Sequence, residues 1–251
     1  MNLTAILLTF NEEHNIARTL SALSKLECVL VIDSFSSDKT VKIAEGFPNV
    51  TVLQRAFDEH TKQWEFARSL VESDWTLALD ADYQVSENAL NEILEIESSN
   101  PSEAGFYTDF LYAIDGKVIK SGIYPPVCVL YKTASCEYQK DGHTQRLFVN
   151  GKTGKLKHKL IHDDRKSFSH WIQSQVNYAK LEAEKLIKSP KIDLSKNDKV
   201  RLKFKLTPIL VFFYCIFAKG GINDGIAGWK YAYQRLLAEI ILQYFLLDLK
   251  K

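Results

Sequence analysis

The sequence predicts an α/β protein with a mostly parallel, doubly wound, Rossmann-like sheet. Strand-like and helix-like segments alternate through the first hundred residues, and each strand-like segment is a short apolar run such as 3–9 or 28–32. Such runs are typical of strands buried on both faces, and their alternation with helices favours parallel pairing. The pattern changes near Pro101, so we expect a region of another kind to follow.

Hydrophobic spacing places the elements of this first region. After the first strand, Ile16, Leu20 and Leu23 fall on one side of a helix. Gly46 and Pro48 end the second helix, and Ser86 can cap the fourth. In chain order we expect strands and helices alternately at 3–9, 12–25, 28–32, 38–46, 50–53, 61–72, 75–79 and 87–96.

The rest of the chain differs in character. Residues 105–160 are rich in Tyr, Val, Gly and Lys, which favours short strands and hairpins, with a turn at Asp115-Gly116. A long helix is expected at 168–188, and a polar connector follows it. We therefore expect an α/β domain at 1–165, with halves at 1–100 and 101–165, and a helical extension at 166–251.

Composition indicates a folded chain in a reducing compartment. The 251 residues are 46% hydrophobic and 25% charged, which are ordinary globular values and argue against disorder. The four cysteines form no CxxC pair, so we expect reduced, mostly buried thiols and a cytoplasmic location. The N-terminal segment lacks the basic stretch and cleavage site of a signal peptide.

The last fifty residues combine basic side chains with an apolar run. Residues 206–218 carry no charge, but these 13 positions are fewer than the roughly 20 that a helix needs to cross a bilayer. Lysines flank the run, and residues 229–249 predict one more helix. We expect residues 200–251 to lie on the inner face of the plasma membrane. The alternative is a helical hairpin that packs on the first domain or in a dimer interface.

Charge is divided unevenly along the chain. Residues 1–150 hold 12 Lys and Arg against 22 Asp and Glu, whereas residues 151–251 hold 20 against 9. An acidic front half suits a metal ion, and a basic back half suits an anionic surface. Because the basic residues are interleaved with the apolar run, a membrane fits better than duplex nucleic acid, and we expect no nucleic-acid partner.

Polar motifs follow three of the predicted strands. They are Thr9-Phe10-Asn11-Glu12-Glu13, the segment from Asp33 to Thr40, and Asp80-Ala81-Asp82. Ligands bind at the carboxyl ends of strands in open α/β sheets, so we expect these motifs to share one site. Two carboxylates around one small residue can hold Mg²⁺ or Mn²⁺, which leave positions open for phosphate oxygens, although such a triplet can also be a solvated turn.

Asp33 can accept hydrogen bonds from a base or a ribose, and the helix that follows presents free N–H groups to an anion. The alternative, which is compatible with the first, is that Ser37 or Asp38 only caps that helix. No GxGxxG or GxxxxGK[ST] motif occurs, so the sequence does not support dinucleotide binding or P-loop hydrolysis.

Together, TFNEE, VIDSFSSDKT and LALDAD resemble the nucleotide-binding half of family 2 glycosyltransferases, which have the GT-A fold. The resemblance covers about the first hundred residues. It implies that Thr9, Asn11 and Glu12 line the nucleotide pocket and that Asp33 reads the base, commonly uracil. It also implies that Asp82 binds the metal beside Asp80. Ser36, Gln63 and Ala81 belong to the same expected pocket.

Later segments resemble a subgroup, the bacterial lipopolysaccharide-core β-glucosyltransferase-like enzymes. The matching segments are Gln63, Gly122-Ile123-Tyr124-Pro125, Asp141-Gly142-His143, Leu160-Ile161-His162 and the stretch 221–225. The chain departs from the subgroup at Tyr83-Gln84, where Glu-Arg is usual, and at Thr144, where Glu is common.

An inverting transfer needs a group that takes the acceptor's proton. Asp141 is the first candidate base and His143 the second, with Asp163 and Asp164 behind them; Asp141 can also be an ordinary turn residue. His162 can complete the metal sphere or be a hydrogen-bonded histidine at a strand end. Arg146, Arg165 and Lys166 are candidates for binding diphosphate or an anionic acceptor.

The motifs, together with the family resemblance, predict a Mn²⁺- or Mg²⁺-dependent glycosyltransferase, and the resemblance implies that it is inverting. Its expected donor is a UDP-sugar, and its expected acceptor is a membrane-associated glycan or lipid-linked molecule in cell-envelope polysaccharide synthesis. Transfer to polyprenyl phosphate is an alternative, because those enzymes share the front-half motifs. A non-catalytic membrane- or nucleic-acid-binding protein is a second alternative. A nucleotidyltransferase is disfavoured because TFNEEHN is acidic and lacks glycine.

Overall fold

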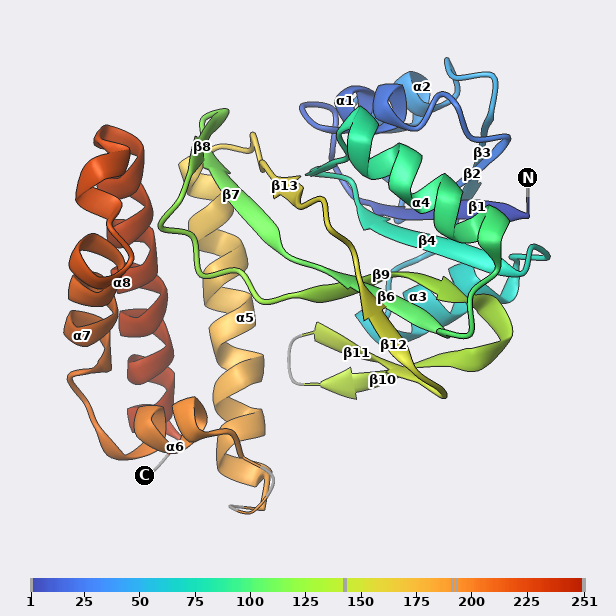
Figure 1. The fold of residues 1–251 in the computed structure, drawn as a ribbon. Helices are drawn as coiled ribbons and strands as arrows, with labels where there is room; N and C mark the ends of the chain where they lie inside the picture. Colours follow the sequence, from blue (N-terminus) through green and yellow to red (C-terminus); the bar gives the residue numbers. More distant parts are fainter. Residues whose placement is uncertain (1, 142–143, 191, 193, 250–251) are drawn as a thin grey trace. The chain divides into compact units, whose positions relative to one another are not determined.

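The computed structural model describes residues 2–141, 144–190, 192 and 194–249 (Figure 1). The chain divides into two compact units. The first comprises Met1–Gly116, Tyr124–Lys140 and Gln145–Arg165, and the remaining residues form the second.

The first unit is built on a seven-stranded sheet in the order β12-β6-β9-β4-β1-β2-β3. Its parallel part consists of β1 (Leu3–Thr9), β2 (Cys28–Asp33), β3 (Val50–Gln54) and β4 (Trp75–Asp80). Next to β4 lies the antiparallel strand β9 (Val127–Lys132), which also pairs with β6 (Gly105–Thr108). β12 (Thr153–Lys155) pairs with β6 and is the last strand on that side of the sheet. This is the mostly parallel α/β sheet that the apolar runs predicted.

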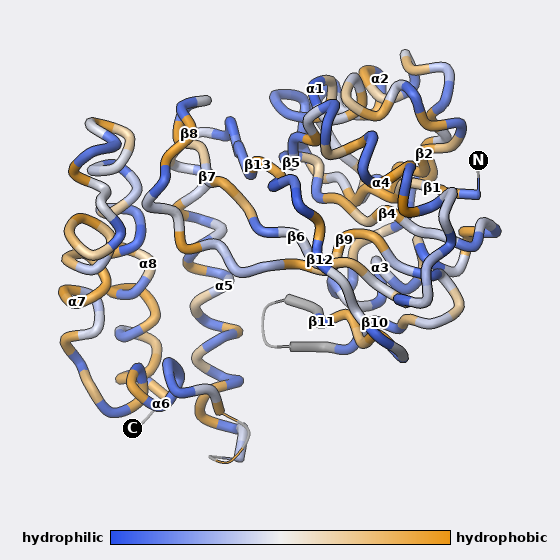
Figure 2. The backbone as a smooth tube through the Cα atoms, viewed as in Figure 1, coloured by the Kyte–Doolittle hydropathy of each residue, from blue (hydrophilic) through white to orange (hydrophobic). Residues whose placement is uncertain are grey.

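Helices cover both faces of the sheet (Figure 1). On one face α1 (Ile16–Ala22) and α4 (Glu87–Ser99) pack on alternate residues of β1, such as Leu3 and Leu7. On the other face α3 (His60–Ser69) packs through Trp64 on Ile6. Because successive strand residues point to opposite faces, both faces of β1 are apolar, which explains its unbroken hydrophobic run. Figure 2 shows the hydrophobic colour gathered in these central strands.

Smaller elements complete the first unit. β13 (Leu160–His162) pairs with β5 (Tyr83–Gln84) on one side and β7 (Phe110–Ile114) on the other. β10 (Cys136–Asp141) pairs with β11 (Thr144–Val149), and a 3₁₀ turn (Thr133–Ser135) precedes β10. The short helix α2 (Thr40–Ala44) follows the loop after β2.

The second unit is mainly helical. It contains the short strand β8 (Lys117–Ile119) and four α-helices: α5 (Phe168–Lys188), α6 (Lys196–Lys203), α7 (Thr207–Phe213) and α8 (Ile226–Asp248). A π-helical turn (Tyr214–Ala218) extends α7, and a 3₁₀ turn (Gly221–Asp224) precedes α8. In its core, Ala183 and Leu186 of α5 pack against Leu242 and Leu246 of α8.

Several predicted details need correction. α1 begins at Ile16 rather than at residue 12, because the preceding polar residues form a loop whose backbone is bonded to other loops. The polar connector expected after residue 188 is followed by α6, which begins at Lys196 and which a capping box at Ser195 and Asp198 starts. The cysteines are mostly buried, as expected: three are buried and Cys28 is exposed. The turn at Asp115-Gly116 is confirmed, with φ of 51° and 78°.

Candidate active site

The loops after β1 and β2 are bonded to each other. The backbone N–H of Asn11 donates to Ser36 Oγ at 2.8 Å, and Asn11 Oδ1 accepts from the N–H of Ser37 at 2.9 Å. The N–H of Glu12 donates to Thr40 Oγ1 at 2.7 Å. The structure therefore gathers Asn11, Glu12 and Ser36 at the carboxyl edge of the sheet, as the sequence predicted from their positions.

Asp33 lies under these loops and is fully buried. Thr9 Oγ1 donates to its Oδ1 at 2.9 Å, and Ser36 Oγ donates to the same oxygen. Oδ2 accepts from the N–H of Ser36 at 2.8 Å and from Gln54 Nε2 at 3.2 Å. A carboxylate offers about four lone-pair positions, so these four bonds use all of them.

Gln63 is fully buried on α3. Its Nε2 donates to Ser34 Oγ at 3.2 Å and to the carbonyl of Arg55 at 3.3 Å, and its Oε1 accepts from Arg55 Nη1. Gln63 thus links the loops that follow β2 and β3. Trp64 beside it is a packing residue, since it is buried and stacks on Tyr138 at 5.5 Å between ring centroids.

The Asp80-Ala81-Asp82 motif lies at the same edge. Asp80 is in register with Leu8 on β1, one residue before the pair of Thr9 and Asp33. Ala81 is buried, and its carbonyl accepts from Thr19 Oγ1 at 2.6 Å. These contacts fix the direction in which the chain leaves β4.

Asp82 meets His162. Pairing of β5 with β13 places His162 opposite Tyr83, and His162 Nε2 lies 3.0 Å from Asp82 Oδ2. Both side chains are about 15% exposed, with 15% for His162 and 16% for Asp82. Burial alone would lower the pKa of His162, but the charge and hydrogen bond of Asp82, helped by Asp80 and Asp164, raise it.

Aromatic rings surround His162. The rings of Tyr112 and Tyr124 each lie 4.8 Å from its imidazole, and that of Tyr83 lies 5.6 Å away. The hydroxyls of Tyr83 and Tyr124 are 2.7 Å apart. Burial, with the charge of Asp80, raises the pKa of both phenols, so both remain neutral donors at physiological pH.

The donor set at this point suits a hard divalent cation. Mg²⁺ and Mn²⁺ accept carboxylate oxygens, and Mg²⁺ is often held by only one or two protein carboxylates together with substrate phosphates. Asp82 and His162 supply an oxygen and a nitrogen, and His162 Nδ1 is buried with no hydrogen-bond partner in the described part of the chain. In that same part no cluster of three or more such ligands occurs.

Asp163 forms a buried hub next to His162. Its Oδ2 accepts from Arg18 Nη1 at 2.6 Å, Arg165 Nε at 2.7 Å and Gln84 Nε2 at 3.0 Å. Its Oδ1 accepts from the N–H of Gly116 at 3.2 Å. With both oxygens engaged and 2% exposure, Asp163 acts in positioning β13 rather than as a base.

The remaining predicted residues have different positions. Arg165 is held by Asp163, Arg146 is exposed on β11, and Lys166 belongs to the second unit. The side chain of Asp141 and the whole of His143 lie outside the described residues, so both candidate bases remain predictions.

Sequence reasoning missed Asn15 and Arg18. Asn15 is fully buried, donates to Glu12 Oε2 at 2.8 Å and accepts from Arg18 Nη2 at 2.7 Å. It also accepts from the N–H of Arg165 at 3.1 Å, so it ties the loop after β1 to the segment after β13. The one available signal was a polar residue on the otherwise apolar side of the predicted helix.

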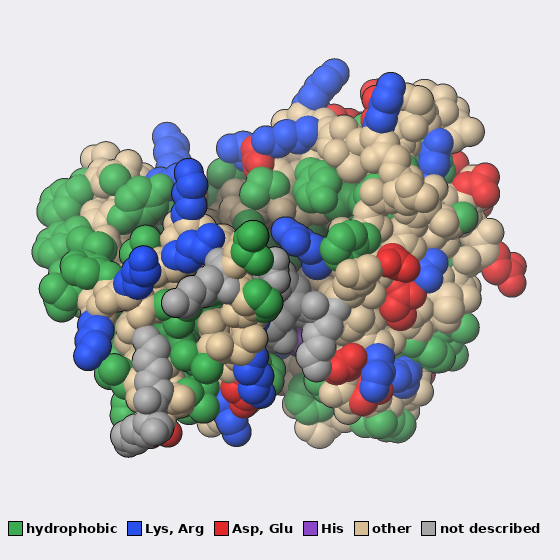
Figure 3. Space-filling view, turned by 90° about the horizontal axis from the view of Figure 1, so that it is seen from below, with side chains coloured by type: hydrophobic (Ala, Val, Ile, Leu, Met, Phe, Trp, Pro, Cys, Tyr) green, Lys and Arg blue, Asp and Glu red, His purple; other side chains and the backbone are tan. Residues whose placement is uncertain are grey.

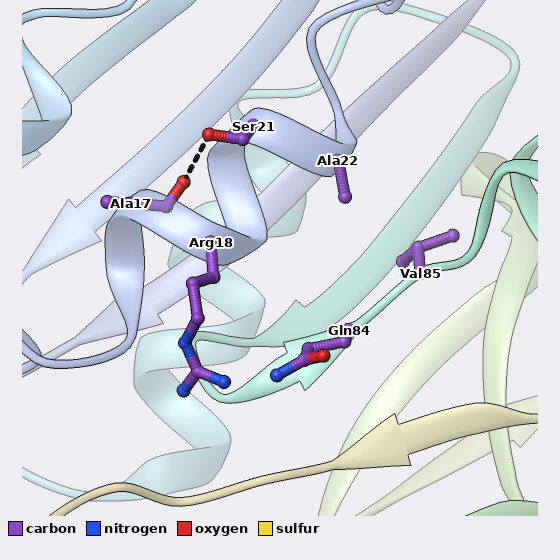
Figure 4. A pocket seen from close by; sticks show the side chains of 6 residues that line it. All are labelled: Ala17, Arg18, Ser21, Ala22, Gln84 and Val85. Atoms are coloured by element: carbon purple, nitrogen blue, oxygen red, sulfur yellow. Dashed lines mark hydrogen bonds between the residues drawn. The ribbon is translucent and has the colours of Figure 1, made fainter. Parts of the chain in front are cut away.

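A shallow pocket of about 410 Å³ lies beside α1 (Figure 4). It is lined by Ala17, Arg18, Ser21, Ala22, Gln84 and Val85. Arg18 and Gln84 are both bonded to Asp163, and Ser21 Oγ is bonded to the carbonyl of Ala17 at 2.7 Å. Its polar groups therefore already have partners, and none of the residues predicted for the nucleotide or the metal lines it.

Part of the chain is similar to known glycosyltransferases. Residues 4–106 match the model of the family described as glycosyl transferase family 2. A 99-residue stretch is 35% identical to an uncharacterised glycosyltransferase of Rickettsia felis, covering 39% of this chain and 35% of that protein. A relative from Rickettsia conorii is 34% identical over 99 residues, with the same coverage. The match thus spans about a third of the curated relatives' length.

Solved structures share the fold. S. aureus TarS, crystallised with UDP-GlcNAc, has a TM-score of 0.52 and 14% identity, covering 100% of this chain and 92% of that one. The mannosyltransferase PcManGT from Pyrobaculum calidifontis, in complex with GDP-Man and Mn²⁺, has a TM-score of 0.59 and 12% identity, covering 100% and 88%. The segment 4–106 is thus similar to family 2 glycosyl transferases, and the fold is of the GT-A type.

Proposed function

We propose that the protein is an inverting glycosyltransferase that moves a sugar from a nucleoside diphosphate donor, a UDP-sugar, to a membrane-associated glycan or lipid-linked acceptor of the cell envelope. The observation that carries the proposal is the pairing of Asp82 with His162 at 3.0 Å, because Asp82 comes just after β4 within the segment that matches the family 2 model. This pair lies at the sheet edge where Thr9, Asn11 and Asp33 gather.

Each part of the site has a role in this proposal. The loops after β1 and β2 hold the nucleoside, with Asp33, Ser36 and Gln63 fixing their shape. Asp82 and His162, with Asp80 nearby, would hold Mn²⁺ or Mg²⁺, which would neutralise charge on the departing diphosphate. Arg165 can bind an anionic group, since its side chain is 40% exposed beside Asp163.

Inversion requires a base that takes a proton from the acceptor hydroxyl. We assign this role to Asp141, with His143 as the second candidate. The variant Asp141→Asn should lose sugar transfer while its donor affinity stays within twofold of the wild type. Full transfer activity in this variant would move the base elsewhere.

The second unit provides a surface for the membrane in this proposal. Large apolar side chains of α7, the turns after it and α8 are exposed, including Phe213, Phe217 and Trp229. Figure 3 shows hydrophobic side chains gathered on the side where Figure 1 draws α7 and α8, with basic side chains nearby. In the described part of the chain no helix is both long and apolar enough to span a bilayer. A helical surface of this composition fits a membrane interface.

The proposal is tested by calorimetric titration of the protein with UDP, GDP and a UDP-sugar, each with and without Mn²⁺. We expect UDP to bind more tightly with Mn²⁺ and GDP to bind more weakly than UDP. Absence of binding to every nucleotide would contradict the proposal, and a preference for GDP would change the donor.

A further inference from the structure

Phe35 has an unusual backbone conformation in the loop after β2. Its φ is 59°, in the left-handed region. The other described non-glycine residues with positive φ are Asn11, Asn100 and Asp115, residue types that tolerate this conformation. A bulky aromatic residue in the left-handed region carries strain that the surrounding structure must hold in place.

Hydrogen bonds on both sides maintain the strain. The N–H of Ser34 donates to the carbonyl of Thr9 at 2.9 Å, which continues the pairing of β1 with β2. The N–H of Ser36 donates to the buried carboxylate of Asp33 at 2.8 Å, and Ser36 Oγ accepts from the N–H of Asn11. Phe35 therefore lies between Ser34 and Ser36, which are both held in place by hydrogen bonds.

The ring of Phe35 gains little from this arrangement in the protein alone. It is 56% exposed, and it takes part in none of the ring-to-ring contacts between described residues. Phe10, the residue after Thr9, is 51% exposed as well. Thr9 and Asp33 are register partners on β1 and β2. Phe10 directly follows Thr9, and Phe35 lies two residues after Asp33, so both phenylalanines follow neighbouring strands at the same edge of the sheet. A strained backbone that presents an unpacked ring indicates a ring kept for a ligand.

We propose that the ring of Phe35 stacks on the nucleobase of the donor. The inference rests on the proposed function and deepens it, because it assigns a contact residue in the nucleotide site. An aromatic face and a base stack well, and loss of such contacts typically weakens binding by tenfold or more. The Asp33 carboxylate and the Phe35 ring then provide the polar and apolar sides of one base site.

The experiment combines three substitutions with two readouts. Phe35→Gly and Phe35→Ala both remove the ring, but only glycine adopts a positive φ without strain. We therefore expect the glycine variant to unfold at a higher temperature than the alanine variant, while both bind UDP with Mn²⁺ about tenfold more weakly than the wild type. Phe35→Trp should keep the wild-type affinity.

Two controls separate stacking from damage to the loop. Phe148→Ala removes another exposed phenylalanine, on β11 of the same unit, and should leave UDP affinity unchanged. Pyrophosphate with Mn²⁺ should bind the wild type and both ring-deleted variants equally, because it has no base. UDP affinity within twofold of the wild type in both variants would overturn the inference, as would an equal loss for pyrophosphate. If the wild type binds no nucleotide, the proposed function itself fails.

Discussion

Asp33 meets the nucleotide only if one of its present partners gives way. All four of its hydrogen bonds come from the protein, and the bond from Gln54 is the longest at 3.2 Å. Gln54 is also the exposed member of the set. In the proposed site a base N–H would take the place of the Gln54 amide N–H, so Gln54 would compete with the base for Asp33.

This competition predicts the sign of a mutational effect. Gln54→Ala should raise UDP affinity by about two- to tenfold, since one hydrogen bond contributes roughly 0.5–1.5 kcal/mol net. Titration calorimetry with UDP checks it, with Gln139→Ala on β10 as an exposed control. A fall in affinity would show instead that the Gln54 amide binds the nucleotide.

At the scale of elements, helix α4 holds the segment that leads into β13. Glu92 accepts from the backbone N–H groups of Lys157 at 2.7 Å and His158 at 3.0 Å, and it lies 2.8 Å from His158 Nδ1. Burial alone would raise the pKa of Glu92, but these hydrogen bonds outweigh it and lower the pKa. His162 lies four residues after His158, so these contacts of Glu92 help to hold His162 in its place in the site.

The lowered pKa of Glu92 makes the stability of the fold depend on pH. A carboxyl group with a lowered folded-state pKa stabilises the fold above its unfolded pKa, near 4.5, and loses that contribution as pH falls through the folded value. Glu92→Gln should therefore lower the unfolding free energy by about 1 kcal/mol at pH 7 and by little at pH 3. Urea unfolding at both pH values measures it, with Glu95→Gln on the same helix as the control. An equal loss at both pH values would contradict this account.

The sequence predicted the sheet because buried parallel strands and strand-end polar motifs depend on local patterns. The strand runs of β1, β2 and β4 were placed to within a residue, and the family 2 resemblance of the first hundred residues was confirmed. The hub of Asn15, Arg18 and Asp163 could not be predicted, since it joins residues 145 positions apart. Pairing between distant segments such as β5 and β13 leaves no local trace in the sequence.

At the scale of the whole molecule, the exposed apolar surface of α7 and α8 needs an explanation. Phe213 and Phe217 are 49% and 62% exposed, and their rings stack 5.8 Å apart. Lys203, Lys205 and Lys219 are exposed nearby in the chain. Exposed aromatic rings and lysines both favour contact with an anionic lipid surface over contact with water alone.

The double variant Phe213→Ser, Phe217→Ser should bind vesicles containing anionic phospholipid at least tenfold more weakly than the wild type, because each ring loses much of its burial energy. Salt should weaken the wild type's binding as well. Co-sedimentation measures both effects, with Phe148→Ser as the control. Unchanged vesicle binding would contradict the proposal, and a dimer that the variant dissociates would assign the surface to a second copy.

If Asp82 and His162 hold a divalent ion against a nucleoside diphosphate, UDP binding must depend on Mn²⁺ through these two residues. We expect Mn²⁺ to strengthen UDP binding to the wild type and to Asp109→Ala, a control that removes the carboxylate bonded to Lys155. In Asp82→Ala the effect of Mn²⁺ should vanish while the unfolding temperature stays within a few degrees. Retention of the full Mn²⁺ effect in Asp82→Ala would contradict the account.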